Sequence, residues 1–180
     1  MENKILDLGL ITLGDKVVVS DPCYNICTWC SGIINNLLPG VYSCHTLQGI
    51  VKGWEDWGIR EKELYITHLS SSIKPEDISE PTNFDIGVDS GTAGIFDYDY
   101  YEKYHDKEKD RKSFEKWYDE FVCDVIDEHY NITSDLGIWS RSGLGDGSYD
   151  CFIHTNSDGK VDGIKIVFID DDLIEEEELN

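Results

Sequence analysis

Short runs of β-branched and aromatic residues, separated by turn residues, recur along the chain and predict a β-rich fold. Gly, Pro, Asn and Asp flank these runs, which is typical of strands bounded by turns. Strands are expected over residues 16–19, 40–45, 63–69 and 84–89. Near the end, residues 149–155 and 161–169 flank an Asn-Ser-Asp-Gly turn, in which Gly and Asp tolerate a positive φ. This arrangement predicts a C-terminal β-hairpin.

One segment has a helical period instead. Between about residues 110 and 130, apolar residues recur at steps of three and four, which is the spacing of one helix face. The stripe consists of Phe114, Trp117, Tyr118, Phe121, Val122, Val125 and Ile126. A shorter helix is expected over residues 28–38, ending before Pro39. The patterns together predict an α+β fold with a mainly antiparallel, sandwich-like β core, one long amphipathic helix and the C-terminal hairpin.

The length of 180 residues fits one domain. We expect a single globular domain over residues 1–170, followed by an acidic tail at residues 171–180. No apolar stretch has the length of a signal-peptide core or of a membrane span, so a cytoplasmic protein without membrane contact is expected. The sequence does not decide the oligomeric state, and a homo-oligomer stays open.

The charge is strongly unbalanced and narrows the range of partners. Thirty-seven acidic residues face fifteen basic ones, which gives a formal net charge of −22. General binding to nucleic acid is excluded, because it works by neutralising phosphates with Lys and Arg. A solvated acidic surface is the simplest explanation, and an acidic decoy or inhibitor that binds a basic protein partner is the alternative.

The stretch DPCYNICTWC places Cys23, Cys27 and Cys30 in a C-x3-C-x2-C pattern. Radical enzymes that use S-adenosylmethionine hold an iron–sulfur cluster with this spacing. Those enzymes are built on barrels of repeated strand–helix units, which need more helices than this sequence predicts. A zinc site completed by Cys44 or His45 is the second interpretation, and small buried thiols are the third.

Several motifs, taken in order, resemble one protein family. They are DPCY (21–24), TWC (28–30), LPGVY (38–42), DIGVDSGTAGIFD (85–97), SGLGDGSYD (142–150) and the SDG turn (157–159). The set is similar to family 4241 of the domains of unknown function, from bacteria and bacteriophages, over about residues 14–170. The resemblance implies a bacterial or phage-infected host cell and no particular chemistry. Cys27 departs from the family pattern, which argues against both the iron–sulfur cluster and the zinc site.

Two glycine-rich segments are the candidates for ligand binding. The first contains Asp89, Ser90, Gly91, Thr92 and Gly94, and the second contains Arg141, Ser142, Gly143, Asp146, Gly147 and Ser148. Glycine lets backbone N–H groups approach a ligand closely, while hydroxyl groups and arginine suit phosphate oxygens. Structural turns or bulges explain the same glycines. The sequence does not show whether the two segments are adjacent.

Three functions are compatible with these features. The first is a non-catalytic protein without a cofactor that binds a phosphate-bearing ligand, such as a cyclic nucleotide signal sequestered in phage counter-defence, with Arg60 or Arg141 offsetting the acidic field. The second is a phosphoester hydrolase with Mg²⁺ or Ca²⁺ at Asp89, Asp97 and Asp146. The third is the acidic decoy. Binding is preferred over catalysis, because no residue set supplies a nucleophile, a base and an oxyanion stabiliser together.

Overall fold

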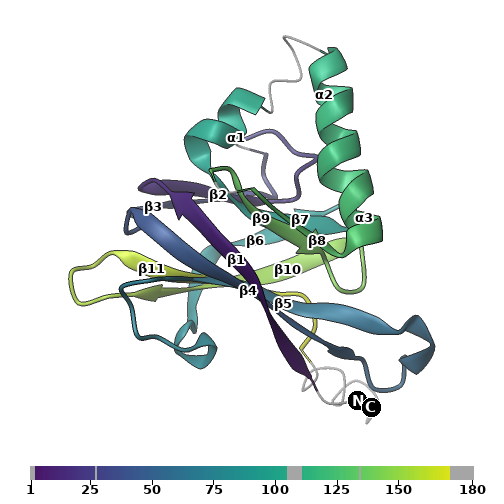
Figure 1. Ribbon diagram of the computed structural model, residues 1–180, viewed down its shortest axis with the longest axis horizontal. Coiled ribbons are helices and arrows are strands. Elements are labelled where there is room, and N and C mark those ends of the chain that lie inside the picture. Colours follow the sequence, from purple (N-terminus) through teal and green to yellow (C-terminus); the bar gives the residue numbers. More distant parts are fainter. Residues whose placement is uncertain (1–2, 27, 105–110, 134, 171–180) are drawn as a thin grey trace.

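The computed structural model describes residues 3–26, 28–104, 111–133 and 135–170. The predicted β-rich architecture is confirmed, since the strands form two antiparallel sheets (Figure 1). The larger sheet has the order β1-β4-β5-β11-β10-β6 and consists of β1 (Lys4–Leu13), β4 (Gly40–Ile50), β5 (Ile59–His68), β11 (Val161–Val167), β10 (Gly147–Thr155) and β6 (Glu80–Val88). The smaller sheet has the order β3-β2-β7-β9-β8 and consists of β3 (Gly32–Asn35), β2 (Lys16–Ser20), β7 (Thr92–Asp97), β9 (Gly137–Arg141) and β8 (Tyr130–Thr133).

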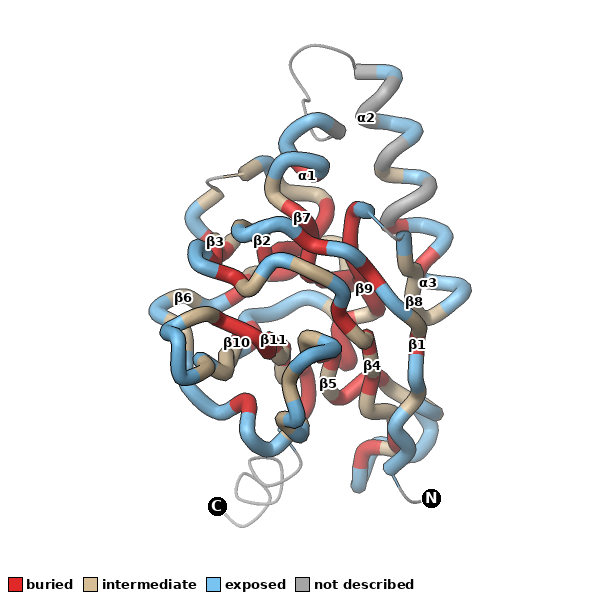
Figure 2. Tube along the Cα trace, turned by 60° about the vertical axis from the view of Figure 1, so that its left-hand side comes forward, coloured by how far each residue is buried: buried red, intermediate tan, exposed pale blue. Residues whose placement is uncertain are grey.

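The smaller sheet lies between the larger sheet and the helices (Figure 1). In β2, Val17 and Val19 face the core between the two sheets, whereas Val18 packs with Tyr101 and Val125 on the helical side. Because both faces of this sheet are covered, its central strands are apolar at successive positions instead of alternating. Figure 2 shows the result in β7, every residue of which is buried.

The strands expected from sequence are present. Residues 16–19 lie in β2 and 40–45 in β4, while 63–68 lie in β5 and 84–88 in β6. The C-terminal hairpin is confirmed as β10 and β11, which pair in antiparallel register. At its turn Gly159 has a φ of 73°, and the Asn156 side chain accepts hydrogen bonds from the backbone N–H groups of Asp158 and Lys160.

The long amphipathic helix predicted over residues 110–130 is wrong as a single element. The segment consists of α2 (Arg111–Tyr118), a π-helical turn (Asp119–Cys123) and α3 (Asp124–Glu128). A π-helical turn adds a residue, which rotates the helical turns that follow by roughly 100° about the axis relative to an unbroken α-helix. Val122 and Val125 are buried but Ile126 is exposed. The side chains of Phe114, Trp117 and Phe121 lie outside the described part.

The helix expected over residues 28–38 is also wrong, because residues 32–35 form β3 along the edge of β2. Backbone pairing with β2 and the β-branched Ile33 and Ile34 favour a strand here. Gly32 lies so close to the Phe84 ring that a Cβ atom at this position would be 1.9 Å from it. Cys27 and the acidic tail at residues 171–180 fall outside the described residues.

The helix α1 (Tyr98–Tyr104) follows β7 directly, and the 3-10 turns Glu55–Trp57 and Pro75–Asp77 follow β4 and β5. Asp97 ends β7, and its Oδ1 accepts hydrogen bonds from the backbone N–H groups of Asp99 and Tyr100 at the start of α1. Within the described residues, no helix combines the length and the apolar character that crossing a membrane would require.

Candidate functional site

The two glycine-rich segments lie side by side at the corner where the chain passes between the sheets. The first connects β6 in the larger sheet to β7 in the smaller one, and the second connects β9 back to β10. On one side of the corner β6 pairs with β10, where Val88 lies opposite Gly147. On the other side β7 pairs with β9, where Thr92 lies opposite Arg141. In between, the N–H of Ser142 donates to the carbonyl of Gly91 at 3.0 Å. The fold therefore brings the two candidate segments together.

Asp21, from the DPCY motif, organises the first segment. Its buried carboxylate accepts hydrogen bonds from the N–H groups of Asp89 (2.8 Å), Ser90 (2.7 Å) and Cys23 (2.7 Å). The Ser90 hydroxyl donates to the same carboxylate at 2.7 Å and lies 2.8 Å from the Thr92 hydroxyl. The N–H groups of Asp89 and Ser90, which the sequence predicts as donors to a phosphate, thus donate to the Asp21 carboxylate of the chain itself. Binding of an external anion here stays a prediction.

Arg141 also has an internal partner. Its Nε lies 3.1 Å from Oε2 of Glu61, a residue with no exposed surface. Oε1 of Glu61 lies 2.8 Å from Nδ1 of His129 and accepts a hydrogen bond from the amide of Gln48 at 2.9 Å. A buried carboxylate needs such partners. The guanidinium therefore compensates the charge of Glu61 at the junction of the two sheets.

Gly94 of the first segment, and Ser142 and Gly143 of the second, are tightly packed. Gly94 lies inside β7, where a Cβ atom would be 2.4 Å from the Cβ of Trp139. Ser142 donates to the carbonyl of Gly145 at 2.7 Å. Gly143 has a φ of 63°, and a Cβ there would meet the backbone oxygen of Glu61 at 2.9 Å. These glycines therefore allow two parts of the same chain to pack closely against each other.

The three aspartates predicted to hold a metal ion have different surroundings. Asp97, the last residue of β7, accepts the N–H of Gly14 at 2.9 Å, while Asp89 accepts the phenolic O–H of Tyr24 at 2.5 Å. Asp146 is exposed. Among the described residues, no three His, Cys, Asp or Glu side chains are grouped for a metal ion. Cys30 is buried, and Cys23 is partly buried. Metal binding at these positions stays a prediction.

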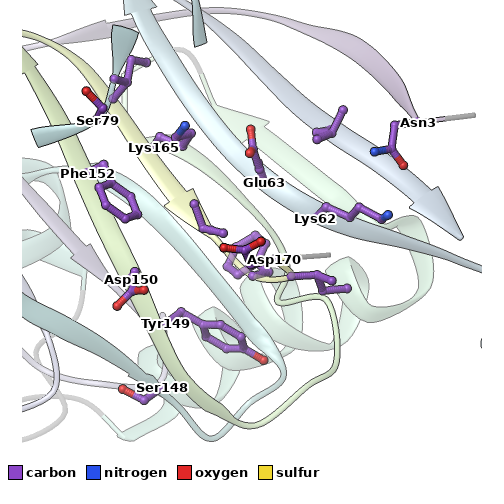
Figure 3. A pocket seen from close by; sticks show the side chains of 15 residues that line it. Asn3, Lys62, Glu63, Ser79, Ser148, Tyr149, Asp150, Phe152, Lys165 and Asp170 are labelled. Atoms are coloured by element: carbon purple, nitrogen blue, oxygen red, sulfur yellow. The ribbon is translucent and has the colours of Figure 1, made fainter. Parts of the chain in front are cut away.

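A cavity of about 600 Å³ opens on the outer face of the larger sheet (Figure 3). Strands β5, β10 and β11 line its floor, and the segment after β11 closes one side. The polar and aromatic side chains that line it are Asn3, Lys62, Glu63, Ser79, Ser148, Tyr149, Asp150, Phe152, Lys165, Phe168 and Asp170. Ser148 belongs to the second glycine-rich segment, so one end of the predicted site reaches this cavity.

A β-bulge directs two neighbouring carboxylates to opposite sides of the larger sheet. Gln48 of β4 pairs with Glu61, and the next residue back, Leu47, pairs with Glu63, which leaves Lys62 as the extra residue on β5. A bulge of this kind re-aims the side chains on its two sides. Glu61 therefore points toward Arg141 of the smaller sheet, whereas Glu63 points into the outer cavity.

The electrostatic setting of Glu63 distinguishes the cavity from an ordinary surface. Burial raises the pKa of the Glu63 carboxyl above its usual value. Lys165 opposes this shift of the pKa, and Asp170 adds to it. The Lys165 ammonium donates to the carbonyl of Pro75 at 3.2 Å and lies 5.9 Å from the centre of the Phe152 ring. A carboxyl with a perturbed pKa in a cavity is a frequent mark of a functional site.

Sequence reasoning missed both Asp21 and the cavity. Asp-Pro is a turn signal, because an aspartate side chain accepts hydrogen bonds from the backbone that follows it. That signal indicates the bond to Cys23 but not the ones to Asp89 and Ser90, which are distant in sequence. Glu63 and Lys165 alternate with apolar residues, which indicates the outer face of each strand. Their proximity follows only from the pairing of β5 with β11.

Comparison with known proteins gives one match. A family model described as a protein of unknown function (DUF4241) matches residues 63–166, which is more than half of the 180-residue chain. The matched region includes the glycine-rich corner, β5 from Glu63 onward, β10 and all but the last residue of β11. No curated protein and no solved structure matches the chain.

Proposed function

Since the chain belongs to the DUF4241 family, whose description names no activity, we propose its function from the cavity: it is a non-catalytic protein that binds a small ligand on the outer face of the larger sheet. The observation that carries the proposal is the partial burial of Glu63, with its raised pKa, beside a cavity of about 600 Å³. Cavities of this size are typical of small-molecule sites.

The lining favours a ligand that combines a cation with an apolar body. Glu63, Asp150 and Asp170 give the cavity three carboxylates against the two ammonium groups of Lys62 and Lys165. The overall charge of −22 strengthens the attraction for a cation. Phe152 and other aromatic side chains supply apolar area that a ligand ring or chain can cover.

Binding is proposed instead of catalysis because the described lining lacks a histidine, a cysteine and an arginine. Hydroxyl groups of Ser79 and Ser148 are present, but among the described residues no histidine base lines the cavity with them. The carboxyl of Glu63 is suited to hold a cationic group of the ligand. An ammonium ion next to it favours the ionised carboxylate and lowers its pKa.

The test is a titration of the full chain with small ligands, monitored by NMR and by calorimetry. Tyramine serves as the cationic probe, because it joins an ammonium group to an aromatic ring. Adenosine monophosphate and a cyclic dinucleotide probe the phosphate ligand predicted at the glycine-rich corner. We expect tyramine to shift resonances of cavity residues in a saturable way, and to bind more tightly as the pH rises through the pKa of Glu63.

Matched variants separate the cavity from general acidity. Glu63→Gln removes the cavity carboxylate, and Asp158→Asn removes the same charge at the exposed turn between β10 and β11. Tyramine affinity should fall about tenfold in the first variant and stay unchanged in the second. If the nucleotides bind at residues 89–94 and 141–148 instead, the phosphate ligand at the corner replaces this proposal. If no probe shifts the cavity resonances, the proposal is wrong.

A further inference from the structure

The turn between β4 and β5 carries two exposed tryptophans. Its sequence from Gly53 to Gly58 is GWEDWG, and the indoles of Trp54 and Trp57 are 39% and 50% exposed. The turn projects from the larger sheet at the lower right of Figure 1, at the opposite end from the β10–β11 turn. Exposed tryptophan is costly to keep in water and is over-represented among residues that dominate protein interfaces.

Hydrogen bonds fix the shape of this turn, which we call the Trp tip (residues 53–58). The N–H of Trp54 donates to the carbonyl of Val51 at 3.1 Å, and the N–H of Trp57 donates to that of Trp54 at 2.9 Å. The Glu55 carboxylate accepts the N–H of Gly53 at 3.0 Å. Val51 is fully buried and anchors the base of the turn. The backbone that carries the two indoles is therefore ordered before any partner arrives, which reduces the entropy that binding would cost.

The Trp tip encloses a hollow with the chemistry of a cation site. Its volume is about 210 Å³, and Trp54, Glu55, Asp56, Trp57 and Gly53 line it. The two indole rings lie 5.0 Å apart between centroids and are tilted by 45°. Backbone hydrogen bonds, first from Gly53, lower the pKa of Glu55, so this carboxylate is ionised at neutral pH. Two aromatic faces beside two carboxylates attract a cation by the ring quadrupole and by charge.

A cation of the chain itself already lies close to the Trp57 indole. The Arg60 guanidinium lies 5.3 Å from the centre of the Trp57 ring. Arg60 is not among the residues that line the hollow, so its guanidinium does not fill that space beside the two indoles. A cation from another molecule can enter there.

We propose that the Trp tip binds another protein by taking an arginine or lysine side chain from a basic segment of that partner. The volume of the hollow suits the cationic end of one side chain. The overall charge of −22 steers a basic protein toward the chain. Phosphate-rich partners such as nucleic acid are repelled by Glu55 and Asp56. The proposal is independent of the ligand proposed for the outer cavity, because the two sites share no lining residue.

The test follows the indole N–H resonances of the full chain by NMR while a blocked pentapeptide with one arginine among glycines is added. The same peptide with neutral citrulline is the control for charge, and tetramethylammonium is the control for a free cation. The salt concentration is kept near 0.15 M, where the Debye length of about 8 Å suppresses distant attraction. We expect saturable shifts for Trp54 and Trp57 with the arginine peptide, at least tenfold weaker binding of citrulline, and weaker binding of tetramethylammonium.

Variants of exposed residues complete the test. Trp54→Ala should weaken binding of the arginine peptide about tenfold, and so should the double variant Glu55→Gln, Asp56→Asn. The matched control is Glu76→Gln with Asp77→Asn, which neutralises an acidic pair in another 3-10 turn (Pro75–Asp77) without tryptophan, and which should leave binding unchanged.

Three results would overturn the proposal. Absence of shifts at Trp54 and Trp57 would exclude the site. Equal losses in the variants of the Trp tip and in the control pair would show general attraction to an acidic surface. Tighter binding of tetramethylammonium than of the arginine peptide would assign the hollow to a free small cation instead of a protein.

Discussion

The glycine-rich corner and the outer cavity both gather polar side chains, yet they use them in opposite ways. At the corner, the buried carboxylate of Asp21 receives three backbone N–H groups and the hydroxyl of Ser90. In the cavity, the carboxyl of Glu63 is partly buried beside an open space of about 600 Å³, and its pKa is raised. Glycine and serine in a loop therefore indicate a tight chain reversal as readily as a ligand site. The outer cavity differs from the corner because it has open space that a ligand can fill.

The largest expected effect tests the structural role of the corner. Replacement Asp21→Ala should lower the free energy of unfolding by about 3 kcal/mol, because four partly buried donors lose their common acceptor. Urea denaturation followed by circular dichroism measures it. Asp146→Ala, an exposed aspartate of the same corner, should change stability by less than about 0.5 kcal/mol. A similar small effect in both variants would contradict the role assigned to Asp21.

The next effect separates two glycines that the sequence places in one motif. Gly94→Ala puts a Cβ atom 2.4 Å from that of Trp139, and overpacking of this kind costs about 2 to 3 kcal/mol. Gly91 has a φ of 69° but has no atom within 4 Å of an added Cβ. Gly91→Ala should therefore cost only about 1 kcal/mol, from backbone strain. Thermal unfolding of the two variants ranks them, and equal midpoints would remove the distinction.

The third prediction concerns the cavity and depends on the raised pKa of Glu63. The folded state favours the protonated carboxyl, so its contribution to stability is complete below the usual pKa of 4.5 and is lost as the pH rises through the raised value. The stability of the native chain minus that of Glu63→Gln should therefore fall over this range. Urea denaturation at a series of pH values measures it. Glu76→Gln, at an exposed glutamate, should show no such trend, and a flat difference for Glu63 would count against its burial.

The smallest expected change in stability is at the Trp tip, which contrasts with both regions. Trp54→Ala and Trp57→Ala should each lower the free energy of unfolding by no more than about 1 kcal/mol, because the two side chains are 39% and 50% exposed and lie outside the core. Denaturation curves measured beside that of Trp139→Ala, at a fully buried indole, set the scale. A large loss at Trp54 or Trp57 would mean that these side chains support the fold.

Local patterns are reliable where strands and turns carry their own signals. The β-branched side chains of residues 16–19 predict a strand, and the Asp-Gly step locates the C-terminal hairpin. The helical period over residues 110–130 also locates helical structure, but it does not predict the π-helical turn at Asp119–Cys123. The helix predicted over residues 28–38 is wrong, because the edge of β2 is not visible in the sequence as a pairing partner for Ile33 and Ile34.

The candidate site is predictable only in part. The sequence marks the two glycine-rich segments as special loops, and tertiary structure adds that they touch through Ser142 and Gly91. The partner of Arg141 is not predictable, because Glu61 is eighty residues away in the sequence and is directed by a β-bulge. The cavity is not predictable either, since its walls come from strands that are separated along the chain.

By itself, the sequence determined the β-rich class, the hairpin and the acidic charge, because strand propensity, turn chemistry and net charge are properties of neighbouring residues or of composition. Tertiary structure alone decided which carboxylate is satisfied and which faces open space. Asp21 and Glu63 are equally polar in the sequence, and only their long-range neighbours give one a full set of hydrogen bonds and the other a raised pKa. The free energy of a buried charge depends on the atoms around it in space, and those atoms come from distant parts of the chain.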